Sequence, residues 1–165
     1  MAVLQGVQPC PLDVVRAHVD YLKATPVAAI GRYIECGALS LARGIITSLE
    51  DLGSLKTEFG DLGGLEANRV HGQDKFLVRQ VLGALRDPRC TDHTSLKSIE
   101  YFMDLDAKGA LEPQLIVTLL FDGTDCQIKD GNKRAVAFYE SRKRRGAGDS
   151  IVFPVYLVRP RALAT

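Results

Sequence analysis

The stretch that decides the fold lies near the end of the chain and reads QLIVTLLFDGTDCQIKDGNKR, residues 114–134. Residues 114–121 are mostly apolar or β-branched, which is typical of a buried strand. Asp122-Gly123 predicts a hairpin turn, because a type I′ turn needs positive φ at both central residues. Residues 126–129 then supply the partner strand. The stretch therefore predicts a β-hairpin that ends at Lys129.

The five residues after the hairpin predict a turn that opens a helix. A helix N-terminus exposes unpaired N–H groups and about half a positive charge, and a preceding glycine lets an anion approach the backbone closely. Arg134 can offer a planar bidentate grip and Lys133 a mobile point charge. Asp130 can cap the helix, orient Arg134 or take part in chemistry. We therefore expect a phosphate to be held by Gly131, Asn132, Lys133 and Arg134.

The basic residues concentrate in and around this helix. Residues 129–145 contain seven basic and two acidic residues, so they carry +5 in a chain whose net charge is +1. Such a local excess suits an anionic ligand. For Arg142 to Arg145 a solvated helix end, favoured by the helix dipole, is the simpler interpretation. The low net charge gives no global field for nucleic acid, which we do not expect as a partner.

The rest of the sequence predicts a single α+β domain over residues 1–165, with a helical N-terminal half and a small mixed sheet in the C-terminal half. The core of this domain is expected over 94–160, and the helical region 1–93 has no assigned role. Apolar residues at helical spacing predict helices over 11–23, 26–34, 39–52, 73–85 and 96–105.

Three local features complete this outline. Thr94 or Ser95 is expected to cap the helix that follows it. Residues 53–72 contain five glycines and predict a long loop, which is either a functional lid or a surface connection. Residues 151–158 predict the last strand, in which Pro154 indicates a sheet edge or a bulge.

Composition points to a cytoplasmic protein without a membrane partner. No apolar run approaches the roughly 20 residues that a membrane-spanning helix needs. The N-terminus lacks the basic start and long apolar core of a signal peptide. The four cysteines are scattered, with no metal-ligand spacing, so no metal site built from protein ligands is predicted.

The C-terminal segments together resemble the ParB/sulfiredoxin superfamily. That pattern is a strand, a short turn, a strand ending in D-G-N-H-R or G-E-R-R, a helix, and a P-V-x-V strand. It is matched here by residues 115–129, by DGNKRAVA (130–137) and by FPVYLV (153–158). The helix over residues 96–109, followed by Glu112-Pro113, also resembles the family. The resemblance covers about residues 94–158, and residues 1–93 match no family pattern.

The resemblance implies that the turn holds a nucleotide phosphate. Sulfiredoxins use a cysteine where Asn132 stands, so their chemistry is not expected. Partition proteins clamp DNA under CTP control through a following helix-turn-helix domain, which is not expected in a chain that ends at Thr165. The remaining branch includes free-amino-acid kinases such as free serine kinases, although Lys133 stands where their histidine does. These kinases use a glutamate from an N-terminal segment as base, for which Glu35, Glu58 and Glu66 are available.

A second resemblance is to the Fic/Doc motif, H-x-F-x-D-G-N-K-R, which shares residues 130–134. Cys126 stands where that motif has its histidine, and Ile128 replaces the phenylalanine. Fic proteins are also helical around the motif, whereas here a hairpin precedes it. We therefore prefer the ParB/sulfiredoxin-like interpretation.

These observations predict a nucleotide-dependent phosphotransferase that acts on a small hydroxyl-bearing metabolite. Its cofactors would be ATP or ADP with magnesium (Mg²⁺), because phosphoryl transfer usually needs a bridging metal. The expected catalytic residues are Asp130, Lys133 and Arg134. Cys126 can reach the ligand from its strand, although a buried small hydrophobe is the simpler interpretation, and His71 can do acid/base work from the glycine-rich loop.

Two other functions fit the same turn. One is a non-catalytic module that holds a nucleotide or phosphorylated metabolite as a switch. The other is a specialised-metabolite enzyme in which the helical first half forms the pocket and the turn binds a carboxylate or phosphate.

Overall fold

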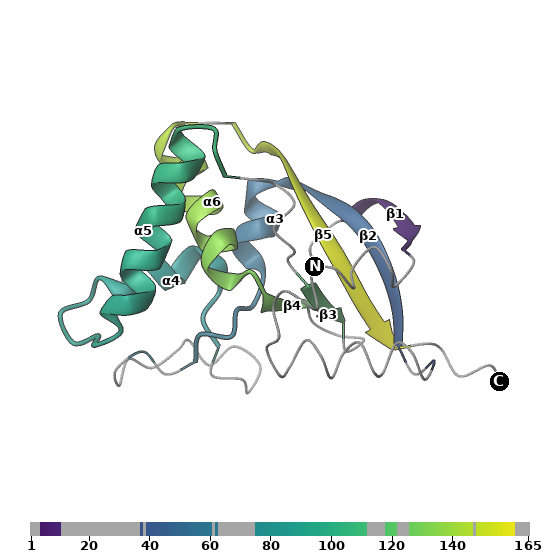
Figure 1. The fold of residues 1–165 in the computed structure, drawn as a ribbon, viewed down its shortest axis with the longest axis horizontal. Coiled ribbons are helices and arrows are strands. Elements are labelled where there is room, and N and C mark those ends of the chain that lie inside the picture. The colour runs from purple at the N-terminus through teal and green to yellow at the C-terminus, as the bar shows by residue number, and fades with distance from the viewer. Residues whose placement is uncertain are drawn as a thin grey trace.

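A computed structural model describes residues 4–10, 37, 39–60, 62, 75–111, 118–121, 126–146 and 148–160. Within these residues, a mixed five-stranded sheet in the order β1-β2-β5-β3-β4 has helices gathered on one side (Figure 1). The strands are β1 (Leu4–Pro9), β2 (Leu39–Ser48), β3 (Thr118–Phe121), β4 (Cys126–Asp130) and β5 (Ser150–Pro160). The helices are α3 (Leu49–Ser54), α4 (Val78–Leu85), α5 (His93–Ala107) and α6 (Asn132–Arg144). The α+β class predicted from the sequence is therefore confirmed.

The prediction of a helical first half with a sheet confined to the second half is wrong. β1 and β2 come from the first half, and β2 pairs antiparallel with β5 along most of its length. The predicted helix 39–52 is instead this strand followed by the short helix α3. The side chains of β2 alternate from Ala42 to Ile46, with Arg43 and Ile45 exposed between buried neighbours. Long-range pairing has therefore overridden the helical spacing of the apolar residues.

The C-terminal elements largely follow the prediction. β3 and β4 form the expected antiparallel ladder, and β5 pairs parallel to β3. The edge position expected for Pro154 is wrong, because β5 lies between β2 and β3 and Pro154 pairs with Ile45. The register does shift nearby, since Ile46 pairs with Phe153 and Ser48 with Ser150. The β3–β4 turn and the predicted helices over 11–23 and 26–34 lie outside the described residues.

Two predicted helices begin at different residues from those expected. α4 starts at Val78, so residues 75–77 precede it as extended chain. α5 is capped by Asp92, whose Oδ1 accepts a hydrogen bond from the Ser95 N–H at 2.9 Å, and not by Thr94 or Ser95. Both helices pack against α6.

Helix α6 lies at the centre of the helical layer and carries the site at its start. It buries a continuous run from Ala135 to Tyr139 and packs against α3, α4 and α5. A Cβ atom on Gly53 of α3 would lie 2.6 Å from the Tyr139 ring, so only glycine allows this approach. The middle of α6 is thereby packed closely against α3. None of the described helices has the length and apolarity needed to cross a membrane.

Candidate phosphate-binding pocket

The Asp130–Arg134 turn is built as the sequence predicts. β4 ends at Asp130, Gly131 adopts a left-handed conformation with φ of 83°, and α6 begins at Asn132. The N-cap residue of this helix is Gly131, which has no side chain to form a capping hydrogen bond. The first intrahelical bond runs from the Ala135 N–H to the Gly131 carbonyl at 2.9 Å. The N–H groups of the first helical turn therefore remain outside the helical ladder.

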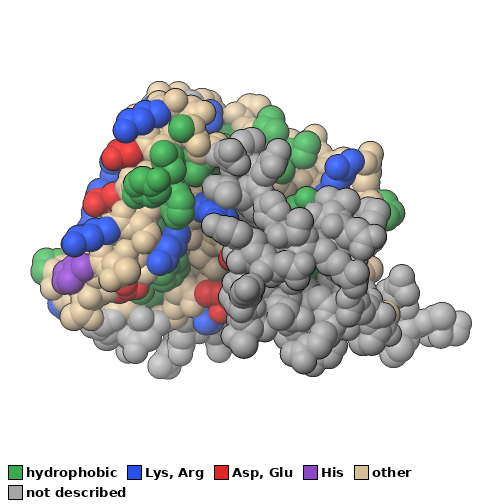
Figure 2. All heavy atoms as spheres, viewed as in Figure 1, with side chains coloured by type: hydrophobic (Ala, Val, Ile, Leu, Met, Phe, Trp, Pro, Cys, Tyr) green, Lys and Arg blue, Asp and Glu red, His purple; other side chains and the backbone are tan. Residues whose placement is uncertain are grey.

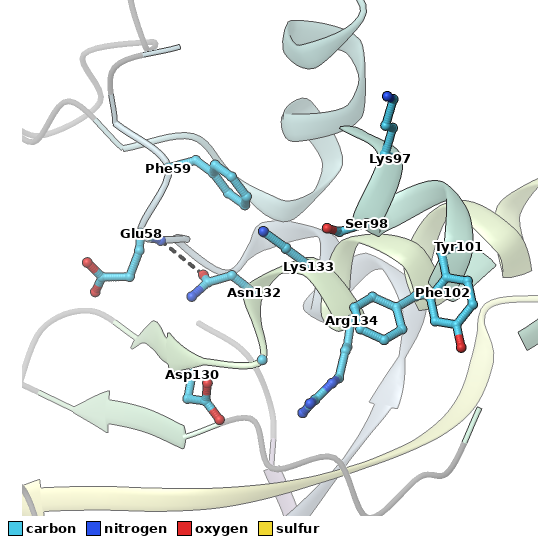
Figure 3. A pocket seen from close by; sticks show the side chains of 11 residues that line it. Glu58, Phe59, Lys97, Ser98, Tyr101, Phe102, Asp130, Asn132, Lys133 and Arg134 are labelled. Carbon is cyan, nitrogen blue, oxygen red and sulfur yellow. Dashed lines mark hydrogen bonds between the residues drawn. The ribbon is translucent and has the colours of Figure 1, made fainter. Parts of the chain in front are cut away.

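This turn forms one wall of a pocket of about 820 Å³. That volume lies within the range of small-molecule sites, roughly 300–1,000 Å³. The second wall is the face of α5 that carries Lys97, Ser98, Tyr101 and Phe102, and the third is Glu58-Phe59 (Figure 3). The pocket is therefore larger than a phosphate group alone would require.

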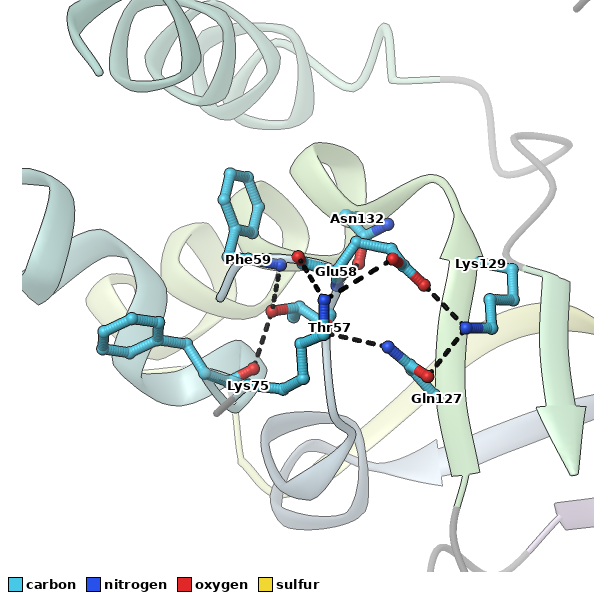
Figure 4. A network of polar contacts seen from close by, with 8 residues as sticks. Thr57, Glu58, Phe59, Lys75, Gln127, Lys129 and Asn132 are labelled. Atoms are coloured by element: carbon cyan, nitrogen blue, oxygen red, sulfur yellow. Dashed lines mark hydrogen bonds and ion pairs between the residues drawn. The ribbon is translucent and has the colours of Figure 1, made fainter. Parts of the chain in front are cut away.

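Glu58 is the residue that joins the first half of the chain to the turn. Its backbone N–H donates to Asn132 Oδ1 at 3.0 Å, across 74 positions of sequence. Its carboxylate accepts from Lys129 Nζ at 2.9 Å, and Lys75 Nζ lies 3.8 Å from the other carboxylate oxygen. Figure 4 shows Glu58 at the centre of this network. Lys129 and Lys75 thus orient the carboxylate of a residue whose backbone is bonded to the start of α6.

The segment that carries Glu58 is itself fixed by backbone hydrogen bonds. The Lys56 N–H donates to the Cys126 carbonyl at 3.3 Å, and the Ile128 N–H donates to the Lys56 carbonyl at 2.9 Å. On the other side, the Thr57 N–H and hydroxyl both donate to the Phe76 carbonyl, at 3.0 and 2.6 Å. Residues 55–59 therefore run between β4 and the residues that precede α4. Of the loop predicted over 53–72, Gly53 and Ser54 belong to α3, and residues 55–59 are held by these hydrogen bonds beside the pocket.

Arg134 is oriented by an aromatic side chain. Its guanidinium carbon lies 5.6 Å from the centre of the Phe102 ring, a cation–π distance. The Phe102 ring is in turn 5.6 Å from the Tyr101 ring, at an interplanar angle of 55°. Within the described residues, neither Lys133 nor Arg134 forms an ion pair with an acidic side chain. Both cations are therefore available to a ligand in the pocket.

Asp92, the N-cap residue of α5, interacts electrostatically with Lys133 of the pocket. Hydrogen bonds from Ser95, side chain and backbone, lower the pKa of the Asp92 carboxyl below its ordinary value of 3.8, and the charge of Lys133 acts in the same direction. Asp92 is therefore an anion at neutral pH that offsets part of the positive charge near the pocket.

The structure brings together most of the side chains predicted from the sequence. Asp130, Gly131, Asn132, Lys133 and Arg134 all line the pocket. Cys126 does not line it among the described residues, because it lies at the opposite end of β4 and packs against the hydrophobic core. His71 lies outside the described residues, as do Glu35 and Glu66. Sequence reasoning did not anticipate the α5 face.

The expected magnesium ion can be compared with the carboxylates of the pocket. No three potential metal-ligating side chains gather anywhere in the described part of the chain. Magnesium in phosphoryl-transfer sites is usually bound by one or two carboxylates together with substrate phosphates. Asp130 and Glu58 are the two carboxylates that line the pocket. The Glu58 carboxylate already pairs with Lys129 and Lys75, so Asp130 is the carboxylate that would share such coordination with the phosphates.

No protein-family model, curated protein or solved structure matches this chain. The resemblance to the ParB/sulfiredoxin superfamily therefore rests on the quoted motifs and stays a prediction. The functional argument depends on the geometry of the pocket.

Proposed function

We propose that the protein transfers a phosphoryl group from a nucleotide such as ATP to the hydroxyl of a small metabolite. One observation carries this proposal. The oriented Glu58 carboxylate lines the same pocket as the start of α6, which follows Gly131 and carries Lys133 and Arg134. Phosphoryl transfer depends on positioning and on stabilising the charge of the transferred group, and this arrangement supplies both. The order β3, β4, α6, β5 further supports a ParB/sulfiredoxin-like core over residues 94–158.

Four of the pocket side chains have a direct role in this reaction. The N–H groups at the start of α6, together with Lys133 and Arg134, bind the phosphates and stabilise negative charge. Glu58 accepts the proton of the acceptor hydroxyl. The hydroxyl oxygen then bonds to the terminal phosphorus while the bond from that phosphorus to the bridging oxygen breaks, and the nucleoside diphosphate leaves with that electron pair. Magnesium, held by Asp130 and the phosphates, would neutralise part of the phosphate charge.

The first test is a thermal-shift titration of nucleotides with magnesium on the wild type and on Arg134→Ala. At a hundredfold excess over the dissociation constant, a bound nucleotide adds about 2.7 kcal/mol to the free energy of unfolding. We expect that gain in the wild type and its loss in Arg134→Ala. Arg144→Ala is the matched control, because Arg144 is an exposed arginine in the last turn of the same helix. Absence of any nucleotide effect on the wild type would contradict the proposal.

The second test separates catalysis from binding. Glu58→Gln keeps the shape and a hydrogen-bonding oxygen for Lys129, but it removes the base. We expect the release of nucleoside diphosphate, measured with a panel of hydroxyl-bearing acceptors, to fall at least a hundredfold, the usual contribution of a general base. Nucleotide affinity should change little. Glu50→Gln, at an exposed glutamate of α3, serves as the control.

Two outcomes would replace the proposal with an alternative function. Tight nucleotide binding without turnover for any acceptor would indicate a binding switch. The other outcome is that no nucleotide binds, but an anionic metabolite binds the wild type and not Arg134→Ala. That outcome would indicate a different enzyme that uses the same turn.

A further inference from the structure

The in-line geometry of phosphoryl transfer divides the pocket into two sides. The attacking and leaving oxygens lie roughly opposite each other across the phosphorus. If the phosphoryl group sits at the start of α6 and the acceptor meets Glu58, the rest of the nucleotide must lie on the far side of the turn. Figure 3 shows that Tyr101 and Phe102 of α5 lie on that side, with Asn132 and Arg134 between them and Glu58.

Tyr101 is unusual among the aromatic residues of the described chain. Its side chain is 60% exposed although it lines the pocket. Figure 2 shows hydrophobic side chains gathered on the α5–α6 side of the molecule, bordered by lysines and arginines. An exposed aromatic ring beside cations is the combination that proteins use to hold a base and its phosphates together.

A continuous set of contacts connects the Asp130–Arg134 turn to the Tyr101 ring. The Arg134 guanidinium lies over the Phe102 ring, and the Phe102 ring contacts that of Tyr101, each at 5.6 Å between centres. Lys97, Ser98, Tyr101 and Phe102 share one face of α5, because residues three and four positions apart are neighbours on a helix. A ligand that leaves the turn along Arg134 therefore meets the Phe102 ring and then the Tyr101 ring.

We propose that Tyr101 stacks against the nucleobase of the bound nucleotide, so that the α5 face is the nucleoside subsite of the pocket. This inference rests on the proposed function and names the part of the site that distinguishes a nucleotide from a bare polyphosphate. Stacking on an aromatic ring tolerates different bases. The subsite therefore favours nucleoside triphosphates over inorganic triphosphate and discriminates little among bases.

The test compares four nucleoside triphosphates (ATP, GTP, CTP and UTP) with inorganic triphosphate, in calorimetric titrations with magnesium. We expect Tyr101→Ala to weaken nucleotide binding roughly 5- to 150-fold, which corresponds to the 1–3 kcal/mol of one stacked base. Its affinity for inorganic triphosphate should stay unchanged. Tyr101→Phe should retain both affinities, and Arg134→Ala should lose both. Val152→Ala, at an exposed valine of β5 outside the pocket, is the control for loss of an exposed apolar side chain.

The outcomes separate this inference from the proposed function. If Tyr101→Ala binds nucleotides as tightly as the wild type, or loses nucleotide and inorganic triphosphate equally, the stacking role is overturned while the phosphate site stands. Equal affinity of the wild type for nucleotides and inorganic triphosphate overturns it as well. If the wild type binds neither, both the inference and the proposed function fall.

Discussion

The two ends of helix α6 are both basic, but their basic side chains have different neighbours. At the C-terminal end, the carboxylate of Asp106 accepts from Arg142 Nη2 at 3.3 Å and also from Arg145. Arg142 lies 4.8 Å over the Phe138 ring. At the N-terminal end, Lys133 and Arg134 form no ion pair with an acid among the described residues, and they line a pocket.

This difference shows that local charge alone does not identify a binding site. Both ends contribute to the same +5 segment of the sequence. Arg142 and Arg145 are already engaged by a carboxylate that is only 5% exposed, and they lie where the helix dipole favours them. At the N-terminal end, Lys133 and Arg134 add their charge to the positive end of the helix dipole, so a balancing anion would have to be a bound ligand. A site is therefore expected where basic residues without an ion-pair partner also line a pocket.

The largest effect on stability is expected from removing the acid at the C-terminal end. Asp106→Asn leaves Arg142 and Arg145 without their anion, and we expect the free energy of unfolding to fall by about 2 kcal/mol. Denaturant unfolding would measure this, with the exposed Asp104→Asn on the same helix as the control. Nucleotide binding should be unaffected. If Asp106→Asn weakens nucleotide binding as much as Arg134→Ala does, the two ends are not functionally distinct.

The glycines that flank α6 provide the next test. Gly131 and Gly146 both have positive φ, at 83° and 62°. A left-handed conformation costs a residue with a Cβ about 1–2 kcal/mol, so both alanine substitutions should destabilise the protein by similar amounts. Only Gly131→Ala should also reduce the thermal shift caused by nucleotide. Equal ligand responses in the two variants would show that the conformation of Gly131 serves the fold alone.

The smallest effect concerns the pH dependence of stability near the pocket. The pKa of Asp92 is lower in the folded protein than its ordinary value, mainly because Ser95 donates hydrogen bonds to it. Its charged form therefore stabilises the fold above about pH 4, and this contribution is lost as the pH falls further. Asp92→Asn keeps a capping oxygen without the charge. We expect it to lower stability by about 0.3–1 kcal/mol at pH 7.

The measurement is the difference in unfolding free energy between the wild type and Asp92→Asn from pH 7 down to pH 3. That difference should shrink toward low pH. A difference independent of pH would show that the charge of Asp92 contributes nothing, and that the hydrogen bond alone caps α5.

Among the described residues, the sequence predicted β4, α6 and β5 better than β2, for physical reasons. β4, α6 and β5 carry local signals: a strand pattern, a glycine that opens a helix, and a β-branched final segment. The strand β2 has apolar residues at helical spacing. Its strand conformation depends on pairing with β1 and β5, which are distant in sequence. Gly44, followed by Ile45, Ile46 and Thr47, was the available local signal against a helix.

The candidate site was predictable only as far as local sequence extends. The five residues of the turn could be identified because they are contiguous. The choice of Glu58 over the other glutamates depends on its hydrogen bond with Asn132 across 74 positions, which no local pattern encodes. Tyr101 likewise reads as an ordinary helical residue until α5 is packed against α6.

The hydrogen bonding of residues 55–59 has a consequence for how the protein opens. This segment is bonded to β4 on one side and to Phe76 on the other, and Thr57 at its centre is fully buried. The candidate base and the phosphate turn therefore belong to one cooperative unit in amide hydrogen exchange. A ligand that bridges Glu58 and the start of α6 would slow exchange at Thr57 together with exchange in α6. Occupancy of the pocket could thus be followed from a backbone amide that never contacts the ligand.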